Sequence, residues 1–231
     1  MSRAEKNIIG LEHGKVGDRI GVVRGGKQYY KGLYKPTNPR SPKQQMHRDK
    51  LAFLNRLSAV LADAVNLGFA LVPKPDSGQT ARNAFVHENW ENGTAVWDDE
   101  HGEWGLCPER LLLAKGPRFI SGDISAAVSE GQLHISCPTP GMSDSHSVAD
   151  DRMYVAVYRP EASRLHLFAG PLREDCSESE FALPEEILRK NEEMHVYVWF
   201  QATRYHRSGG GKITVRPNQA SPSLYLGSFR A

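Results

Sequence analysis

The sequence predicts a mainly β protein with one prominent N-terminal α-helix and a C-terminal β-sandwich. Residues 41–68 begin with a capping pattern and continue with apolar residues at helical spacing. After Val72, short segments of alternating polar and apolar residues are separated by turn residues, which is typical of strands. Hydrophobic residues make up 39% of the 231 residues and charged residues 24%, so the chain can form a packed core.

Residues 1–40 are predicted to form a basic, glycine-rich arm that contains a β-hairpin. Residues 18–24 and 28–34 are its two expected strands, and Gly25 and Gly26 join them because glycine adopts positive φ at low cost. The segment KPTNPRSPK follows and is expected to be extended, since a residue before proline disfavours the helical region.

Residues 41–68 are predicted to form the amphipathic helix. Ser41 is the expected N-cap and Pro42 the first helical residue, and Gln44 at position N3 completes a capping box with Ser41. One apolar stripe then extends to Ala64, and Gly68 is placed to follow the helix as its C′ residue. The expected helix covers residues 42–67.

The remaining chain is divided into a β-rich connector, residues 69–116, and a sandwich domain, residues 117–231. A short helical turn is expected at 184–190, and in the segment 194–202 one face should be fully buried and the other, from His195 to Gln201, amphipathic. The expected strands are 84–89, 94–97, 111–114, 126–128, 133–137, 152–159, 165–169, 180–183, 194–203 and 224–229.

Charge is distributed unevenly along the chain. Residues 1–56 contain 13 Lys/Arg and 4 Asp/Glu, a net charge of +9, whereas the rest contains 16 and 23, a net charge of −7. This division favours either an acidic partner for the N-terminal part or attraction between copies of the chain. No apolar run approaches the roughly 18 residues of a membrane helix, and the first residues do not resemble a secretory signal.

The motifs of common enzyme and metal sites do not gain support from their surroundings. Residues 21–27 match the phosphate-binding pattern GxxxxGK, but Gln28 replaces the required Ser/Thr, so a hairpin turn is the better interpretation. His134 and Cys137 would point to opposite faces of a strand and cannot share a metal ion. Three cysteines without a CxxC pattern favour reduced thiols. We therefore expect no catalytic residue, metal or cofactor, although a Cys–His pair formed only in the fold stays open.

The basic arm supplies the first candidate binding site. Its tyrosines alternate with cations, a composition that suits phosphate contacts and base stacking, and equally suits an acidic protein surface. The candidate partner-binding residues are Arg24, Lys27, Lys31, Lys35 and Arg40.

Three tryptophans supply the second candidate site. Trp90, Trp97 and Trp104 occur among carboxylates, and aromatic faces beside carboxylates are typical of carbohydrate sites. They could bind a sugar, cleave one, or simply anchor a hairpin.

Two resemblances extend these interpretations. The run Gly14-Lys-Val-Gly17, Gly26-Lys27, Lys35-Pro36 and Asn38-Pro39-Arg40-Ser41-Pro42, closing on Asn66-Leu67-Gly68-Phe69, resembles a family of Bacteroidetes proteins of unknown function, about as long as this chain and frequent in phage and prophage settings. The resemblance continues through Leu113-Ala-Lys-Gly116 to Tyr225-Leu-Gly227. It brings no activity or catalytic residue with it.

Residues 117–231 resemble a fibronectin type III or immunoglobulin-like sandwich. Leu133-x-Ile135 resembles the second strand, Val155-x-Val157 the third and Val196-x-Val198 the sixth. Cys137 stands where a core tryptophan is usual, and Met194 replaces the tyrosine expected at the start of the sixth strand.

Together these observations predict a non-enzymatic structural or assembly protein of a bacteriophage or phage-like particle, made in the bacterial cytoplasm and present in the virion. Its expected partners are further copies of itself, other particle proteins and, through the arm, nucleic acid, but no membrane. A carbohydrate-binding module that uses the tryptophan-rich hairpin is the alternative, and an enzyme with a site assembled from distant loops is the third possibility.

Overall fold

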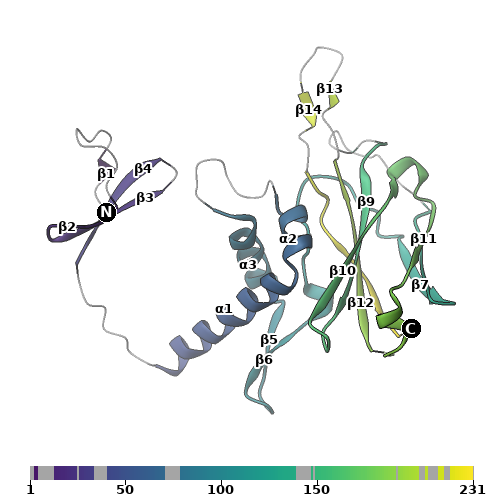
Figure 1. The fold of residues 1–231 in the computed structure, drawn as a ribbon, viewed down its shortest axis with the longest axis horizontal. Helices are drawn as coiled ribbons and strands as arrows, with labels where there is room; N and C mark the ends of the chain where they lie inside the picture. Colours follow the sequence, from purple (N-terminus) through teal and green to yellow (C-terminus); the bar gives the residue numbers. More distant parts are fainter. Residues whose placement is uncertain are drawn as a thin grey trace.

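The computed structural model describes residues 3–4, 13–24, 26–33, 41–70, 79–138, 147, 149–190, 192–202, 206–207, 213–215 and 219–230. Within these residues the protein is mainly β, as predicted, and the helices between residues 42 and 91 are grouped on one side of it (Figure 1). The elements, including two short 3-10 turns, are β1 (Arg3–Ala4), β2 (Gly14–Val16), β3 (Arg19–Arg24), β4 (Lys27–Gly32), α1 (Pro42–Val60), α2 (Ala62–Gly68), α3 (Ala81–Glu91), β5 (Ala95–Asp98), β6 (Glu103–Leu106), η1 (Pro108–Arg110), β7 (Ser125–Ser129), β8 (Gln132–Ser136), β9 (Arg152–Arg159), β10 (Arg164–Leu172), η2 (Arg173–Asp175), β11 (Glu178–Ala182), α4 (Glu185–Leu188), β12 (Met194–Gln201), β13 (His206–Arg207), β14 (Ile213–Val215) and β15 (Leu224–Phe229).

The N-terminal hairpin is confirmed and belongs to a four-stranded sheet with the order β1-β4-β3-β2. Strands β3 and β4 pair antiparallel from Arg19↔Gly32 to Arg24↔Lys27, and Gly26 has the positive φ of +71° that this tight connection requires. The GxxxxGK sequence is therefore a strand and a turn, without the helix that a phosphate-binding loop needs.

The predicted helix begins as expected but is divided in two. The Ser41 side chain accepts a hydrogen bond from the Gln44 backbone N–H, and Pro42 opens the helix. α1 ends at Val60, Leu61 leaves the helical conformation with φ −93° and ψ 18°, and α2 continues to Gly68. The apolar stripe continues across the break, which explains why the pattern predicted one helix.

Gly68 has a different role from the predicted one. It is the last residue of α2 and does not have a positive φ, so it is no left-handed C′ residue. A Cβ atom at this position would overlap the carbonyl oxygen of Leu113 and lie 2.7 Å from the Cα of Ala114. Glycine is needed here because two backbone segments approach each other closely.

Two expected strands in the connector are wrong. Residues 84–89 lie in the helix α3, whose N-cap Thr80 accepts a hydrogen bond from the Asn83 N–H at 3.2 Å. Ala84, Phe85 and Asn89 are buried, which is the spacing of one helical face rather than an alternation. Residues 111–114 form an irregular segment after η1.

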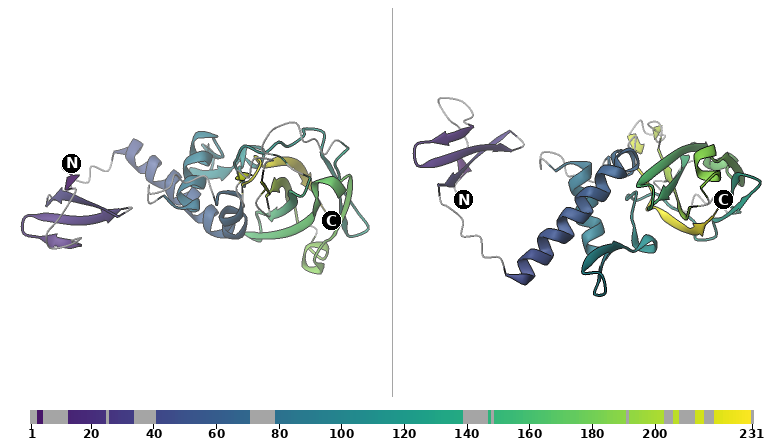
Figure 2. Two further views of the ribbon diagram at one scale, coloured as in Figure 1. Left: turned by 90° about the horizontal axis from the view of Figure 1, so that it is seen from above. Right: turned by 60° about the horizontal axis from the view of Figure 1, so that its bottom comes forward.

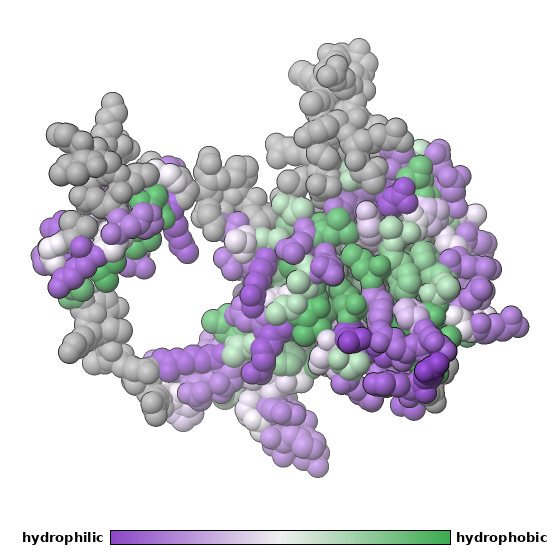
Figure 3. Space-filling view, viewed as in Figure 1, coloured by the Kyte–Doolittle hydropathy of each residue, from purple (hydrophilic) through white to green (hydrophobic). Residues whose placement is uncertain are grey.

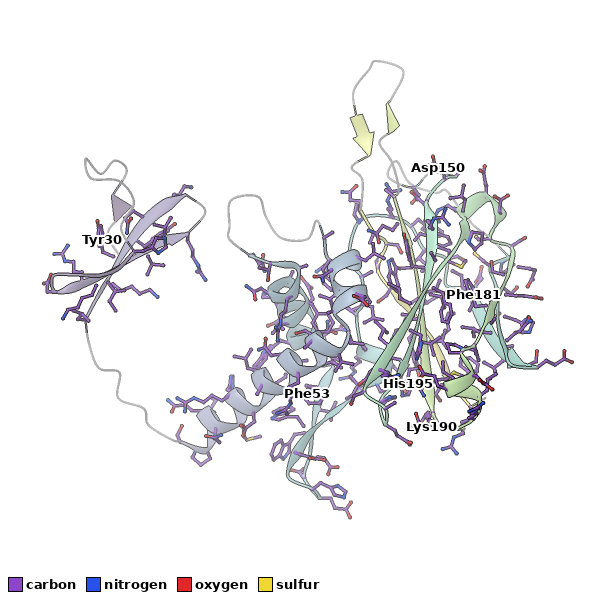
Figure 4. All side chains as sticks on the ribbon, viewed as in Figure 1. Tyr30, Phe53, Asp150, Phe181, Lys190 and His195 are labelled. Atoms are coloured by element: carbon purple, nitrogen blue, oxygen red, sulfur yellow. The ribbon has the colours of Figure 1, made fainter. Side chains whose placement is uncertain are left out.

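The C-terminal part contains two antiparallel sheets that share one apolar cluster. The four-stranded sheet has the order β10-β9-β12-β15 and the three-stranded sheet the order β11-β8-β7. Phe181 of β11 is labelled in Figure 4 and belongs to the cluster. We call this cluster the inter-sheet core; its buried members are Ile124, Leu133, Ile135, Cys137, Met153, Val155, Val157, Cys176, Phe181, Leu183, Ile187, Met194, Val196, Val198 and Phe200.

The second face of the four-stranded sheet is covered by the helices. Tyr197 and Trp199 of β12 have no exposed surface, so the face predicted to be amphipathic is buried like the other. Figure 2 shows α1–α3 grouped beside this sheet. We call the cluster they share the helix-side core; its buried members are Leu54, Leu57, Leu61, Ala64, Val65, Phe69, Ala84, Phe85, Ala95, Leu111, Leu113, Ala114, Ala156, Tyr158, Tyr197, Trp199 and Ala220.

Polar contacts attach the helical layer to the sheet. The Tyr197 hydroxyl donates to the carbonyl oxygen of Pro108 at 2.9 Å, and Gln201 Nε2 donates to the carbonyl oxygen of Leu67 at 3.2 Å. The helix-side core therefore extends across the boundary at residue 116 that the sequence suggests.

Candidate binding surfaces

The strand register places basic residues together on one face of the N-terminal sheet. Side chains of directly paired residues point to the same side of a sheet, and every second residue of a strand does so too. Lys27, Tyr29 and Lys31 of β4 therefore share a face, to which β3 adds Arg24, the partner of Lys27. Lys15 of β2 pairs with Ile20, which also pairs with Lys31, so Lys15 joins the same face. We call Lys15, Arg24, Lys27 and Lys31 the basic face.

The cations of the basic face are exposed to solvent. Among the described residues, the ion pair of this sheet joins Arg19 and Asp18 at 3.7 Å, and none involves the basic face. Tyr29 is half-buried between Lys27 and Lys31 on the same strand. Neither hydrophobic core includes a residue of this sheet, and Figure 1 shows the sheet apart from the helices. The predicted residues Lys35 and Arg40 lie outside the described residues.

The structure brings the three predicted tryptophans into one neighbourhood. Trp97 of β5 pairs directly with Trp104 of β6, and their rings meet edge to face with centroids 5.4 Å apart. Trp90 comes from α3 instead of the hairpin. The prediction of one hairpin that carries all three tryptophans is therefore wrong for Trp90.

Lys50 of α1 joins the tryptophans, and sequence reasoning missed it. Its ammonium nitrogen lies 4.4 Å from the ring centroid of Trp90 and 5.4 Å from that of Trp104. A cation over an indole face is attracted by the ring quadrupole, so Lys50 attaches the hairpin and α3 to α1. One face of each of these two rings is therefore in contact with the protein's own lysine.

A cavity of about 220 Å³ lies beside the hairpin and is bordered by both of its tryptophans. Asp49 and Arg56 of α1 and Glu103 of β6 also line it, so it presents aromatic rings, carboxylates and a guanidinium together. A second, apolar-lined cavity of about 470 Å³ lies between α1 and α3, where Leu51 is 46% exposed.

The turn of the hairpin carries a carboxylate–imidazole contact. Asp98 Oδ2 lies 2.8 Å from His101 Nδ1, and Asp98 Oδ1 accepts hydrogen bonds from the backbone N–H groups of Glu100 and His101. The hydrogen bonds from His101 lower the pKa of Asp98. These bonds stabilise the turn, whose end is covered by hydrophilic side chains in Figure 3.

A buried group of polar side chains lies at one end of the inter-sheet core, and the sequence pattern did not reveal it. Asp151 lies between Arg118 and Arg173, and all three side chains are buried. Cys137 and Cys176 are completely buried beside Arg173. The third cysteine, Cys107, is not part of this group. Such a group forms only when segments distant in sequence meet, so no local spacing marks it.

Within the described part of the chain, no three His, Cys, Asp or Glu side chains are arranged to hold a metal ion. Over the same residues, no helix is both long and apolar enough to cross a membrane. Comparison with protein-family models, with curated proteins and with solved structures gives no match.

Proposed function

We propose that the protein is a non-enzymatic assembly protein whose N-terminal sheet binds neighbouring copies through the basic face. The observation that carries this proposal is the register of β2, β3 and β4, which collects four exposed cations on one side of a small sheet. Among the described residues these cations have no acidic partner within the chain, so an external acidic surface is their best complement.

The acidic remainder of the chain supports a neighbouring copy as that surface. Residues 57–231 carry a net charge of −7 against +9 for residues 1–56. Opposite charges on two parts of one chain attract when copies approach in a head-to-tail arrangement, which generates rings or filaments. The resemblance to proteins from phage settings agrees with such repetition, and we propose a phage or phage-like particle as its setting.

We further propose that residues 117–231 are a sandwich of the fibronectin type III or immunoglobulin-like kind, which serves as the rigid body of the assembly. Seven antiparallel strands divided between two sheets around one apolar cluster support this assignment. The third and sixth strands, β9 and β12, are neighbours in one sheet, as in that fold, and the second strand, β8, lies in the other. Such a domain carries no chemistry of its own.

The test is the assembly state of a charge-reduced variant. We expect Lys15→Gln, Arg24→Gln, Lys27→Gln and Lys31→Gln together to shift sedimentation velocity profiles from multimers towards monomers. Raising the salt concentration should mimic the variant, because at 0.1 M salt exposed charges are already screened beyond about 10 Å. A control that removes two cations outside the basic face combines Arg19→Gln, on the opposite face of the sheet, with Lys43→Gln on α1, and it is compared with the pair Lys27→Gln and Lys31→Gln.

A variant that assembles as well as the unmodified chain would show that the basic face is not an assembly element. If the unmodified chain stays monomeric but binds an oligonucleotide in a salt-sensitive way, and the four substitutions abolish that binding, the partner is nucleic acid.

Carbohydrate binding is the second candidate function, and the cavity of about 220 Å³ favours it. Trp97 and Trp104 offer ring surfaces there, while Asp49, Arg56 and Glu103 offer acceptors and donors for hydroxyl groups. Calorimetric titration with a panel of oligosaccharides tests this function. We expect Trp97→Ala to abolish any heat of binding and Val96→Ala, on the other face of β5, to retain it.

A further inference from the structure

The ends of two strands bring Cys137 and Cys176 together. Strands β8 and β11 pair antiparallel up to Ser136↔Glu178, and the backbone N–H of Cys137 continues the ladder by donating to the carbonyl oxygen of Ser177 at 2.8 Å. Cys137 thus lies beside the residue that follows Cys176. Both side chains belong to the inter-sheet core, so the two cysteines are neighbours within one buried cluster.

The two thiols are in contact and hidden from solvent. Neither side chain has any exposed surface, and the thiols are hydrogen-bonded to each other. Cys176 Sγ can also donate to the carbonyl oxygen of Arg173 at 3.1 Å. Cys107 follows β6 and is partly exposed, so it provides an internal comparison.

The surroundings make the two thiols unequal. Arg173 is fixed over the ring of Phe200, 3.9 Å from its centroid, and its Nε lies 3.4 Å from Asp151. The hydrogen bond from Cys176 lowers the pKa of Cys137, burial opposes this, and the charge of Arg173 assists it. The same hydrogen bond, together with burial, raises the pKa of Cys176. Cys137 is therefore the better nucleophile, and Cys176 keeps its proton.

We propose that Cys137 and Cys176 are a redox-modification site at which hydrogen peroxide forms a reversible disulfide. The Cys137 thiolate attacks one peroxide oxygen, the O–O bond breaks, and sulfenic acid and hydroxide form. The Cys176 sulfur then attacks the Cys137 sulfur, forming the S–S bond and breaking the S–O bond, and the departing oxygen leaves as water with the thiol proton. In total, two thiols and one peroxide give one disulfide and two waters. A dithiol reductant reverses the change by thiol–disulfide exchange.

This site is independent of the basic face and has a structural consequence. The disulfide would close a loop that contains β9 and β10, two strands of the four-stranded sheet, while Cys137 itself follows a strand of the other sheet. A cross-link that closes a long loop stabilises the folded state, so oxidation should raise the unfolding midpoint. Because both sulfurs are buried, the oxidation rate should follow local opening of this end of the core.

The experiment treats the full chain with hydrogen peroxide and maps its cysteines. We expect intact mass to show the loss of two hydrogen atoms, non-reducing peptide mapping to show a Cys137–Cys176 cross-link, and the thermal midpoint to rise by several degrees and return after dithiothreitol. Cys107→Ser is the matched control and should form the same cross-link.

Two variants test the assigned roles. Cys176→Ser should accumulate a sulfenic acid at Cys137 that dimedone traps, whereas Cys137→Ser should give no adduct at Cys176. The proposal is overturned if peroxide oxidises Cys107 in the unmodified chain while both buried thiols stay free, or if the cross-link involves Cys107. That result would leave the two cysteines as small core residues, and it would not affect the assembly proposal.

Discussion

Asp151 and Arg118 form an ion pair in which neither side chain has any exposed surface. The second carboxylate oxygen of Asp151 lies 3.4 Å from Nε of Arg173, which is also buried. One carboxylate therefore faces two guanidinium groups inside the protein. Arg118 further donates to the carbonyl oxygen of Gln219 at 2.8 Å, and Arg173 donates to that of Phe119 at 2.9 Å. These contacts connect the segment before β7 with η2 and with the segments that precede β9 and β15.

Asp151→Asn is expected to destabilise the protein by about 3–5 kcal/mol, because removing one partner of a buried ion pair leaves an uncompensated buried charge. Chemical denaturation followed by tryptophan fluorescence measures this change. Asp123→Asn makes the same substitution at an exposed carboxylate and should change stability by less than about 0.5 kcal/mol. Equal effects of the two substitutions would mean that the buried ion pair does not contribute to stability.

Gly68→Ala is expected to cost about 1–3 kcal/mol, the range for overpacking a well-packed interior. The added methyl group would overlap the backbone at Leu113 and Ala114, neither of which can move as a flexible side chain does. Gly122→Ala is the control, since nothing lies within 4 Å of the Cβ position there. Thermal unfolding of the two variants compares them directly. An unchanged Gly68→Ala midpoint would show that α2 and the 113–114 segment separate without cost.

Folding stability should fall as pH decreases below the ordinary histidine pKa, in part because of His195. Burial is the largest cause that lowers the pKa of His195, and the charges of Glu193 and Glu109 act in the opposite direction. The unfolded chain therefore binds a proton near pH 6.5 more readily than the folded chain does, and protonation favours unfolding. His166 adds to this slope for the same first reason, its burial.

His195→Gln is expected to flatten the dependence of the urea midpoint on pH between about pH 7.5 and about pH 5.5. His195 Nδ1 lies 3.1 Å from the hydroxyl oxygen of Tyr225, so the variant also changes one partly buried contact, and only the slope is diagnostic. Figure 4 labels His195 near the lower end of β12. His87→Gln, at an exposed position on α3, should keep the slope of the unmodified chain. A slope that His195→Gln does not change would assign the effect to other groups.

Local pattern predicted the elements that depend on local physics. Strands β9 and β15 have the predicted ends because alternation and turn residues define them, and the Ser41 cap is where its motif indicated. The strand expected at 84–89 failed because Thr80 was not recognised as an N-cap. Lys50 among the tryptophans and the Cys137–Cys176 contact depend on tertiary structure, so no spacing in the sequence could reveal them.

The sequence also divides the chain at residue 116, and the helix-side core crosses that position. Tyr197 and Trp199 of the four-stranded sheet are completely buried, and their core includes Leu54 of α1 and Phe85 of α3. Tyr154 stacks on Trp199 with centroids 5.8 Å apart. A fragment of residues 117–231 would expose this face, and each large aromatic side chain buries about 150–250 Å².

We therefore expect residues 117–231 alone to be aggregation-prone or loosely packed, whereas residues 41–231 should unfold cooperatively with a midpoint close to that of the full chain. An exposed apolar patch of this size is unusual on a monomeric protein. Amide NMR spectra and binding of a hydrophobic dye distinguish the two fragments.

Within the shorter fragment, Trp199→Gln should improve solubility, because it makes the exposed face more polar. In residues 41–231 the same substitution should destabilise the fold, because a polar amide would replace a fully buried indole. A well-dispersed spectrum of residues 117–231 without the helices would show that the two sheets are an independent folding unit and that the helix-side core contributes little to their stability.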